Sequence, residues 1–186
     1  MDRRENKSKN SQIKGNPLSP STKTFTKTLV HPVTLLSVKA GSEENISTMA
    51  WVSSVSHTPP MLMVAVNPRR YSHQLLEKTD EFAIIVLSDS QKNLSTLAGT
   101  QSGRNIAKWD LQEFNSQRRA ASKIDVPVLE NSRANLECKL RRQVTAGDHT
   151  LFIGEVIHLE FDGDRSPLIL YNRQYFGIGE FLADYP

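Results

Sequence analysis

Three short segments of the chain bring hydroxyl, guanidinium, imidazole and aromatic groups close together. The first, residues 45–56, places five Ser and Thr side chains around Trp51. A flat heterocycle with polar edges needs an aromatic face beside hydrogen-bonding groups, and this segment offers both. An edge strand with solvated serines has the same composition, so the segment alone is compatible with either role.

The second segment, residues 67–72, reads Asn-Pro-Arg-Arg-Tyr-Ser and precedes a predicted short helix with Ser72 as its N-cap. A helix N-terminus presents unpaired N–H groups that attract phosphate. Arg70 adds bidentate donors and Ser72 adds a hydroxyl. The segment therefore suits a phosphate, although an ordinary solvated turn would look the same. The chain contains no Gly-x-Gly-x-x-Gly or Walker-type loop.

The third segment, Gly147-Asp148-His149, stands directly before a predicted strand. An imidazole there can orient a substrate or supply a proton near neutral pH, or it can simply be bonded in the turn. Ser102-Gly103-Arg104 is a weaker candidate, a loop that could bind an anion. One cysteine and five scattered histidines give no zinc-type spacing, so we expect no metal.

The net charge of +3 is unevenly distributed. Residues 1–28 carry seven basic and two acidic side chains, which gives this tail +5 and leaves −2 for the rest. The tail is poor in large apolar groups, so we expect it to be disordered and the folded domain to span residues 29–186. The domain's slight acidity argues against nucleic-acid binding. The sequence has no apolar signal segment and no membrane-spanning stretch, and Cys138 is its single cysteine. We therefore expect a cytoplasmic protein.

Strands dominate the pattern from residue 29 onward. Helices are expected at 72–78, at 91–98 with Ser90 as cap, and near 105–114. Glu137 alternates with apolar neighbours and is expected to face solvent. The predicted strands cover residues 33–38, 46–55, 61–66, 82–87, 136–141, 151–161 and 168–171. About seven strands, two or three short helices and no βαβ alternation favour a mainly β fold, a closed or nearly closed antiparallel barrel.

Taken together and in this order, the segments resemble the flavin reductase-like family, which includes the flavoredoxins and the reductase components of two-component monooxygenases. The resemblance covers roughly residues 29–182. Ser72 stands where the family often has Thr, which keeps the hydroxyl. The matching stretches are His-Pro-Val-Thr-Leu-Leu at 31–36, the run from Ser47 to Val66, Arg-Tyr-Ser at 70–72, Asp-Glu-Phe at 80–82, Ser-Gly-Arg at 102–104, Gly-Asp-His at 147–149, Gly-Glu-Val at 154–156, and residues 171–175.

The resemblance implies an antiparallel, Greek-key-like split β-barrel that binds FMN, and a homodimer with the flavin near the subunit interface. The residues expected to line the flavin ring and ribityl chain are Thr48, Met49, Ala50, Trp51 and Ser53. Arg70 and Ser72 are expected to hold the phosphate, and Asn67 is a further expected cofactor-binding residue. Ser102 and Arg104 would add contacts to the flavin, from the same or the neighbouring subunit. Tyr171 and Tyr175 would cover the site. His149 would be the catalytic residue near the flavin and the nicotinamide.

The implied function is an NAD(P)H-dependent flavin reductase that moves hydride from NADH or NADPH to the flavin. Two alternatives stay open at this point. One is a flavoredoxin-like carrier that binds FMN and receives electrons from a redox partner protein. The other is a flavin-binding protein without turnover.

Overall fold

The computed structural model describes residues 25–184. The predicted tail, residues 1–28, lies outside these residues except for its last four, which form the 3-10 turn η1 (Phe25–Thr28). The strands are β1 (His31–Pro32), β2 (Thr34–Ala40), β3 (Glu43–Met49), β4 (Val52–His57), β5 (Pro60–Val66), β6 (Glu81–Val86), β7 (Arg118–Ala120), β8 (Pro127–Leu129), β9 (Ala134–Ala146), β10 (His149–Phe161), β11 (Ile169–Tyr171) and β12 (Gln174–Phe176).

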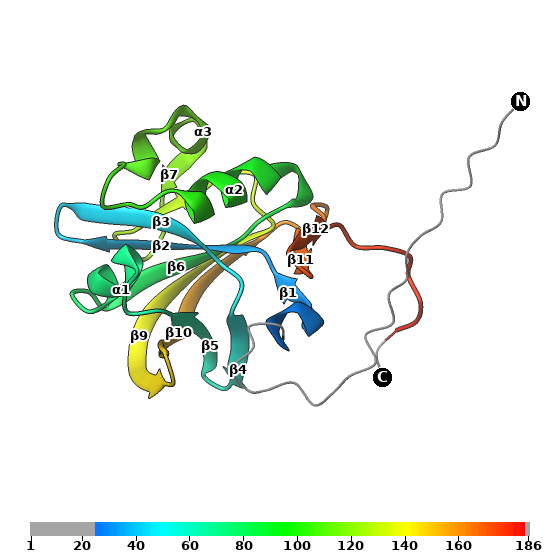
Figure 1. The fold of residues 1–186 in the computed structure, drawn as a ribbon, viewed down its shortest axis with the longest axis horizontal. Coiled ribbons are helices and arrows are strands. Elements are labelled where there is room, and N and C mark those ends of the chain that lie inside the picture. Colours follow the sequence, from blue (N-terminus) through cyan, green and yellow to red (C-terminus); the bar gives the residue numbers. More distant parts are fainter. Residues whose placement is uncertain (1–24, 185–186) are drawn as a thin grey trace, which may run out of the picture.

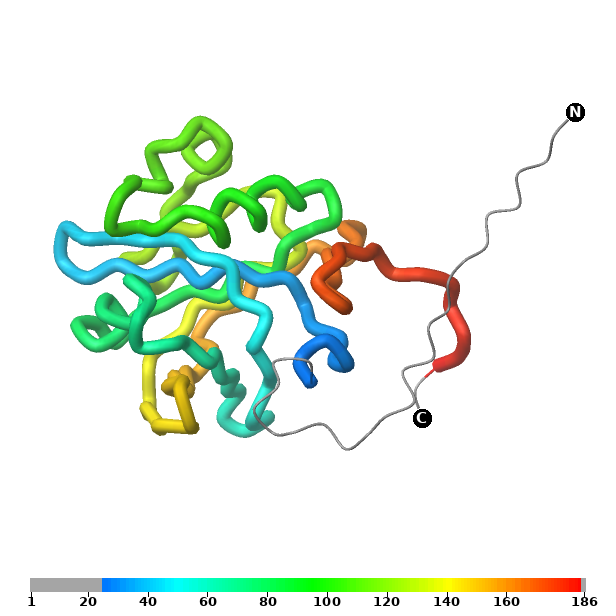
Figure 2. The backbone as a smooth tube through the Cα atoms, viewed as in Figure 1, coloured from blue at the N-terminus to red at the C-terminus, as the bar shows by residue number. Residues whose placement is uncertain are grey.

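Seven of these strands form one antiparallel sheet in the order β3-β2-β6-β9-β10-β5-β4. Two smaller sheets, β1-β11-β12 and β7-β8, flank it (Figure 1). The edge strands β3 and β4 are consecutive in the chain, and only Ala50 and Trp51 join them. Figure 2 follows the chain, in cyan, from β3 straight into β4. The sheet is therefore curled until its two edges approach each other, as a split barrel requires.

The central strands are buried on both faces, which explains their continuous apolar sequences. Along β6, Phe82 and Ile84 belong to a core cluster inside the barrel, while Ala83 and Ile85 belong to a second cluster outside it. The helices cover both clusters. The inner cluster includes Leu75 and Leu76 of α1 (Tyr71–Leu76).

The outer cluster is covered by short helical elements and by β8. These elements are α2 (Lys92–Thr100), η3 (Lys108–Asp110) and α3 (Gln112–Asn115). Leu94, Trp109 and Phe114 are their buried side chains in this cluster. Figure 1 shows α2 and α3 on the side of the sheet opposite α1. The longest helix in residues 25–184 has nine residues, and none is long and apolar enough to cross a membrane.

The mainly antiparallel β prediction is confirmed, but one predicted strand is wrong. Residues 46–55 form the end of β3 and most of β4, with a break at Ala50 and Trp51. The turn between β2 and β3 is short, because Glu43 pairs with Ala40 in the β2–β3 ladder. The sequence does not indicate this break, because the residues on both sides of it have strand-like composition.

Two predicted helix starts are wrong by one or two residues. Arg70, not Ser72, is the N-cap of α1. Ser88, not Ser90, caps the 3-10 turn η2 (Asp89–Gln91) that leads into α2. Ser88 and Gln91 form a reciprocal capping box there. Ser72 therefore lies within the first turn of α1, where its hydroxyl is free to bond to β3 instead of capping its own helix.

Glu137, predicted to face solvent, is fully buried. Its carboxylate accepts the backbone N–H groups of residues 122 and 123 at 2.7 and 2.6 Å, so the loop before β8 covers this face of β9. His158 and Glu160 lie beside it. The side-chain atoms of these three residues that could bind a metal ion lie within 4.8 Å of one another. Glu160 is already paired with Arg119, so both carboxylates are engaged in holding the loop.

Candidate functional site

The edge strand β3 and the start of α1 are joined by a buried cluster of hydroxyl and amide groups. Asn45 Nδ2 donates to Ser72 Oγ at 2.8 Å, and the hydroxyls of Ser47 and Ser72 lie 2.6 Å apart. Asn45 and Ser47 share a face of β3 because side chains alternate along a strand. The structure thus brings residues 47 and 72, predicted from separate segments, into contact.

Gly103 brings the loop 102–104 onto this cluster. A Cβ at Gly103 would lie 2.1 Å from Asn45 Oδ1 and 2.8 Å from Tyr71 Cδ1, so only glycine allows so close an approach. Beside it, Arg104 Nη1 donates to the backbone oxygen of Arg69 at 3.1 Å. Gly103 and Arg104 therefore lie against residues 67–72 of their own chain, and Ser102 Oγ accepts from the Arg104 backbone N–H within the loop at 3.3 Å.

This end of the site carries uncompensated positive charge. The exposed Arg70 side chain has no carboxylate partner within residues 25–184. Lys108 is buried and donates from Nζ to the backbone oxygen of Ala98 at 2.9 Å. Burial, and then the nearby Arg70, lower the pKa of Lys108 to about 8. Asn45 Oδ1 is also buried and receives no hydrogen bond. The unpaired cations at this end of the site can therefore accept an anion.

The other end of the site is aromatic. The rings of Trp51 and His149 lie 4.6 Å apart between centroids, tilted by 42°. His149 Nδ1 and Asp148 Oδ1 are 2.7 Å apart, which fixes the imidazole. Asn67 Nδ2 donates to the Asp148 backbone oxygen at 2.9 Å. Trp51, His149 and Asn67, predicted from three separate segments, therefore lie together.

The remaining predicted residues of β3 are held by contacts on both of its faces. Thr48 Oγ1 donates to the Ser95 backbone oxygen at 2.6 Å, and Ser95 Oγ lies 2.9 Å from Tyr175 Oη. Met49 packs against the inner core cluster, and its backbone oxygen accepts from Thr34 Oγ1 at 2.7 Å. Tyr175 is thus placed close to β3, and Ala50 lies at the seam beside Trp51.

Two predicted residues are not brought to this group by any contact. Ser53 is exposed on β4, and its hydroxyl bonds to the neighbouring Ser54 backbone oxygen. Tyr171 is exposed at the β11–β12 hairpin, where its ring lies 6.2 Å from that of Phe176. Sequence reasoning missed Lys108, because a lysine next to Trp109 and Asp110 resembles a solvated helix end.

The arrangement suits an extended ligand with an anion at one end and a flat ring at the other. At the rise of a strand, residues 47–51 span about 13 Å, from the hydroxyl cluster to Trp51. Unpaired cations at one end match a phosphate, and the Trp51–His149 pair at the other offers an aromatic surface. The residues present therefore fit a flavin with its ribityl phosphate.

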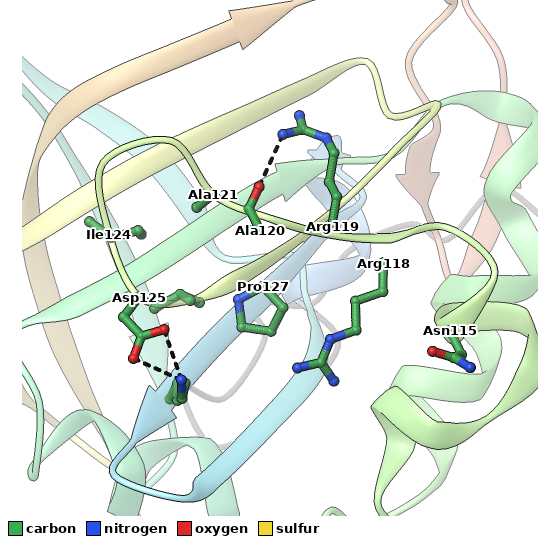
Figure 3. Close-up of a pocket in the computed structure, with 10 residues that line it drawn as sticks. Asn115, Arg118, Arg119, Ala120, Ala121, Ile124, Asp125 and Pro127 are labelled. Carbon is green, nitrogen blue, oxygen red and sulfur yellow. Dashed lines mark hydrogen bonds and ion pairs between the residues drawn. The ribbon is translucent and has the colours of Figure 1, made fainter.

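Two cavities, of about 330 and 420 Å³, lie away from these residues. Figure 3 shows the smaller one, beside β7 and β8. Its charged lining side chains are all paired: Lys39 with Asp125 at 2.7 Å, Arg118 with Glu44 at 2.5 Å, and Arg119 with Glu160. This cavity has no charge left for a ligand, so the site on β3 is the better candidate.

Known proteins resemble this chain in sequence and in fold. An uncharacterised protein of Archaeoglobus fulgidus is 34% identical over 126 residues, which cover 68% of this chain and 70% of that protein. An NADH:riboflavin 5'-phosphate oxidoreductase of Streptomyces pristinaespiralis is 27% identical over 154 residues, covering 79% and 81%. The solved structure of an NADH:FAD oxidoreductase from Streptomyces globisporus superposes with a TM-score of 0.81 at 23% identity, over 89% of this chain and 99% of that one.

The structural likeness confirms the split β-barrel fold. The family comparison goes further, because the flavin reductase like domain matches residues 26–179. That range includes the hydroxyl cluster on β3, the cations beside it and the Trp51–His149 pair. The chain therefore belongs to the flavin reductase-like family.

Proposed function

We propose that this protein is an NAD(P)H-dependent flavin reductase that binds FMN and passes hydride to it from a nicotinamide. The observation that carries the proposal is the two-ended site, with unpaired cations at one end of β3 and the Trp51–His149 pair at the other. Relatives named as NADH oxidoreductases of riboflavin 5'-phosphate and of FAD support the reaction. The single, buried Cys138 suits a cytoplasmic protein.

The phosphate end supports FMN as the flavin. Arg70 offers bidentate donors at the start of α1, beside the hydroxyls of Ser47 and Ser72. These groups suit a terminal phosphate and the sugar chain next to it.

The aromatic end supports the electron transfer. A bound flavin supplies the hydride-accepting ring, and the protein supplies its position. Trp51 provides a wall, and Asp148 holds the imidazole of His149 in one orientation. His149 can thereby position a nicotinamide against the ring without touching the phosphate end.

Replacing Arg70 with Ala tests the phosphate end. Loss of a charged donor to phosphate should weaken FMN binding by on the order of tenfold or more. Riboflavin, which lacks the phosphate, should bind equally well to R70A and to the unchanged protein. Both affinities can be measured by flavin fluorescence titration.

Arg142→Ala is the matched control, because Arg142 is exposed on β9, at the opposite side of the barrel from β3 in the sheet order. It should leave both affinities unchanged. Equal FMN affinity in R70A and R142A would remove Arg70 from the phosphate site.

Replacing His149 with Ala tests the aromatic end. We expect the reduction of bound FMN by NADH or NADPH to slow by about tenfold or more, because the donor is no longer held in a reactive position. FMN affinity should stay within about twofold, since the phosphate contacts are untouched. Anaerobic stopped-flow absorbance measures the rate, with the exposed His57→Ala as control. An unchanged rate in H149A would exclude this residue from the mechanism.

We also propose that the protein is a homodimer. Large apolar side chains are exposed along the second half of β10 and in the C-terminal segment, including Leu159, Phe161, Phe176, Phe181 and Leu182. An exposed apolar surface of this kind marks a protein–protein interface. A second copy of the chain would cover it.

Replacing Leu159 with Glu should therefore convert the dimer to a monomer, because a carboxylate would be buried in the interface. Val144→Glu is the control, since Val144 is an exposed apolar residue at the far end of the β9–β10 hairpin. Light scattering coupled to size exclusion measures both masses. A monomeric unchanged protein at micromolar concentration would contradict the proposal.

A further inference from the structure

Lys108 has an unusual environment for a lysine. Its side chain is only 3% exposed, and it lies in η3, against β3 and the end of α2. An ammonium group carries three N–H donors, and Lys108 Nζ donates to the Ala98 backbone oxygen. No carboxylate forms an ion pair with Lys108 in the described part of the chain.

The charged groups on the surrounding elements do not supply a counterion. Glu43 of β3 is bonded to Lys78 and Tyr71, and Glu44 is paired with Arg118. The titratable or charged groups on the elements around Lys108 are Asp110 of η3, Glu43 and Glu44 of β3, Lys92 of α2, Glu113 of α3, and Arg69, Arg70, Tyr71 and Arg104 of the neighbouring loops. Of these, only Arg70 shifts the pKa of Lys108, and it lowers it.

Lys108 and Arg70 therefore lie near each other, and no carboxylate within residues 25–184 pairs with either of them. Burial without a counterion is unfavourable for an ammonium group, which is why the amine holds its proton weakly, with a pKa of about 8. A dianionic phosphate held by Arg70 and Ser72 would supply the missing negative charge. Its field would favour the protonated form of the amine.

We propose that Lys108 is the buried cation of the phosphate end and that FMN binding draws a proton onto its amine. This inference rests on the proposed flavin function and adds to it a binding residue and a pH dependence. Arg70 keeps its charge at every pH used below, so it supplies constant attraction. Burial raises the pKa of Tyr71 above its usual value, so this phenol stays neutral up to pH 9.

The consequence is a loss of FMN affinity at alkaline pH. Near pH 7 the Lys108 amine is largely protonated before FMN arrives, and the phosphate is a dianion because its second pKa is about 6. Above pH 8 the free protein must take up a proton to bind. FMN affinity should then fall by up to about tenfold per pH unit. Riboflavin has the same ring without the phosphate, so its affinity should not follow this trend.

The ligand-free protein provides a readout independent of flavin. The unfolded chain binds the Lys108 proton with the ordinary pKa of 10.5, and the folded chain binds it only near 8. Between these values the unfolded state holds more protons, so stability rises with pH and falls as pH is lowered. The melting temperature of the unchanged protein should therefore drop relative to that of Lys108→Met as pH goes from 10 to 8.

The experiment compares FMN and riboflavin affinities by fluorescence titration at pH 7, 8 and 9. In the unchanged protein the FMN-to-riboflavin affinity ratio should fall by about five- to tenfold between pH 8 and 9. In K108M the ratio should already be low at pH 7 and stay constant. In Lys108→Arg it should stay constant because the guanidinium does not titrate. Lys92→Met, which removes an exposed lysine from α2, should behave like the unchanged protein.

Two results would overturn the inference while leaving the proposed function intact. One is a strong FMN preference that does not change between pH 7 and 9 in the unchanged protein. The other is an equal preference in K108M at pH 7. If K108M fails to fold, the pH dependence of the unchanged protein decides alone. Failure of every variant to bind flavin would instead overturn the proposed function, and this inference with it.

Discussion

The rest of the structure depends on the two-residue connection between the edge strands of the large sheet. Met49 ends β3 and Val52 begins β4, so three Cα–Cα steps, about 11 Å at most, separate opposite edges of a seven-stranded sheet. A flat sheet of seven strands would place its edges nearly 30 Å apart. The connection therefore forces the sheet to curl, and Trp51 is fixed at the seam.

The seam also explains why the candidate site is where it is. As an edge strand, β3 has no strand partner beyond it, and α1, α2, η3 and the loop 102–104 gather along it instead. Three of these elements contribute a different feature each: α1 gives the Ser72 hydroxyl, η3 gives the Lys108 cation, and the loop gives the close backbone approach of Gly103. The curl brings His149, at the start of β10, against Trp51. Both ends of the candidate site thus lie along or next to one strand.

Much of this could be predicted from the sequence, and the failures have physical causes. Residues 61–66 and 82–87 were predictable as buried strands because their apolar runs admit little else. The break at Ala50 was not predictable, because residues of strand-like composition continue on both sides of it. Lys108 and Glu137 look like surface residues, and only tertiary packing buries them. Local patterns therefore predict the strands and indicate candidate segments for a site, while the contacts between those segments depend on how the barrel curls.

The most direct test of NAD(P)H-dependent flavin reductase activity is an absorbance spectrum of the purified protein loaded with FMN. NADH or NADPH is then added anaerobically in the same cuvette. A flavin reductase should show visible flavin bands that bleach when the nicotinamide is added. Bands that bleach only with dithionite would indicate an electron carrier fed by another protein. A colourless protein that takes up no added FMN would contradict the flavin assignment itself.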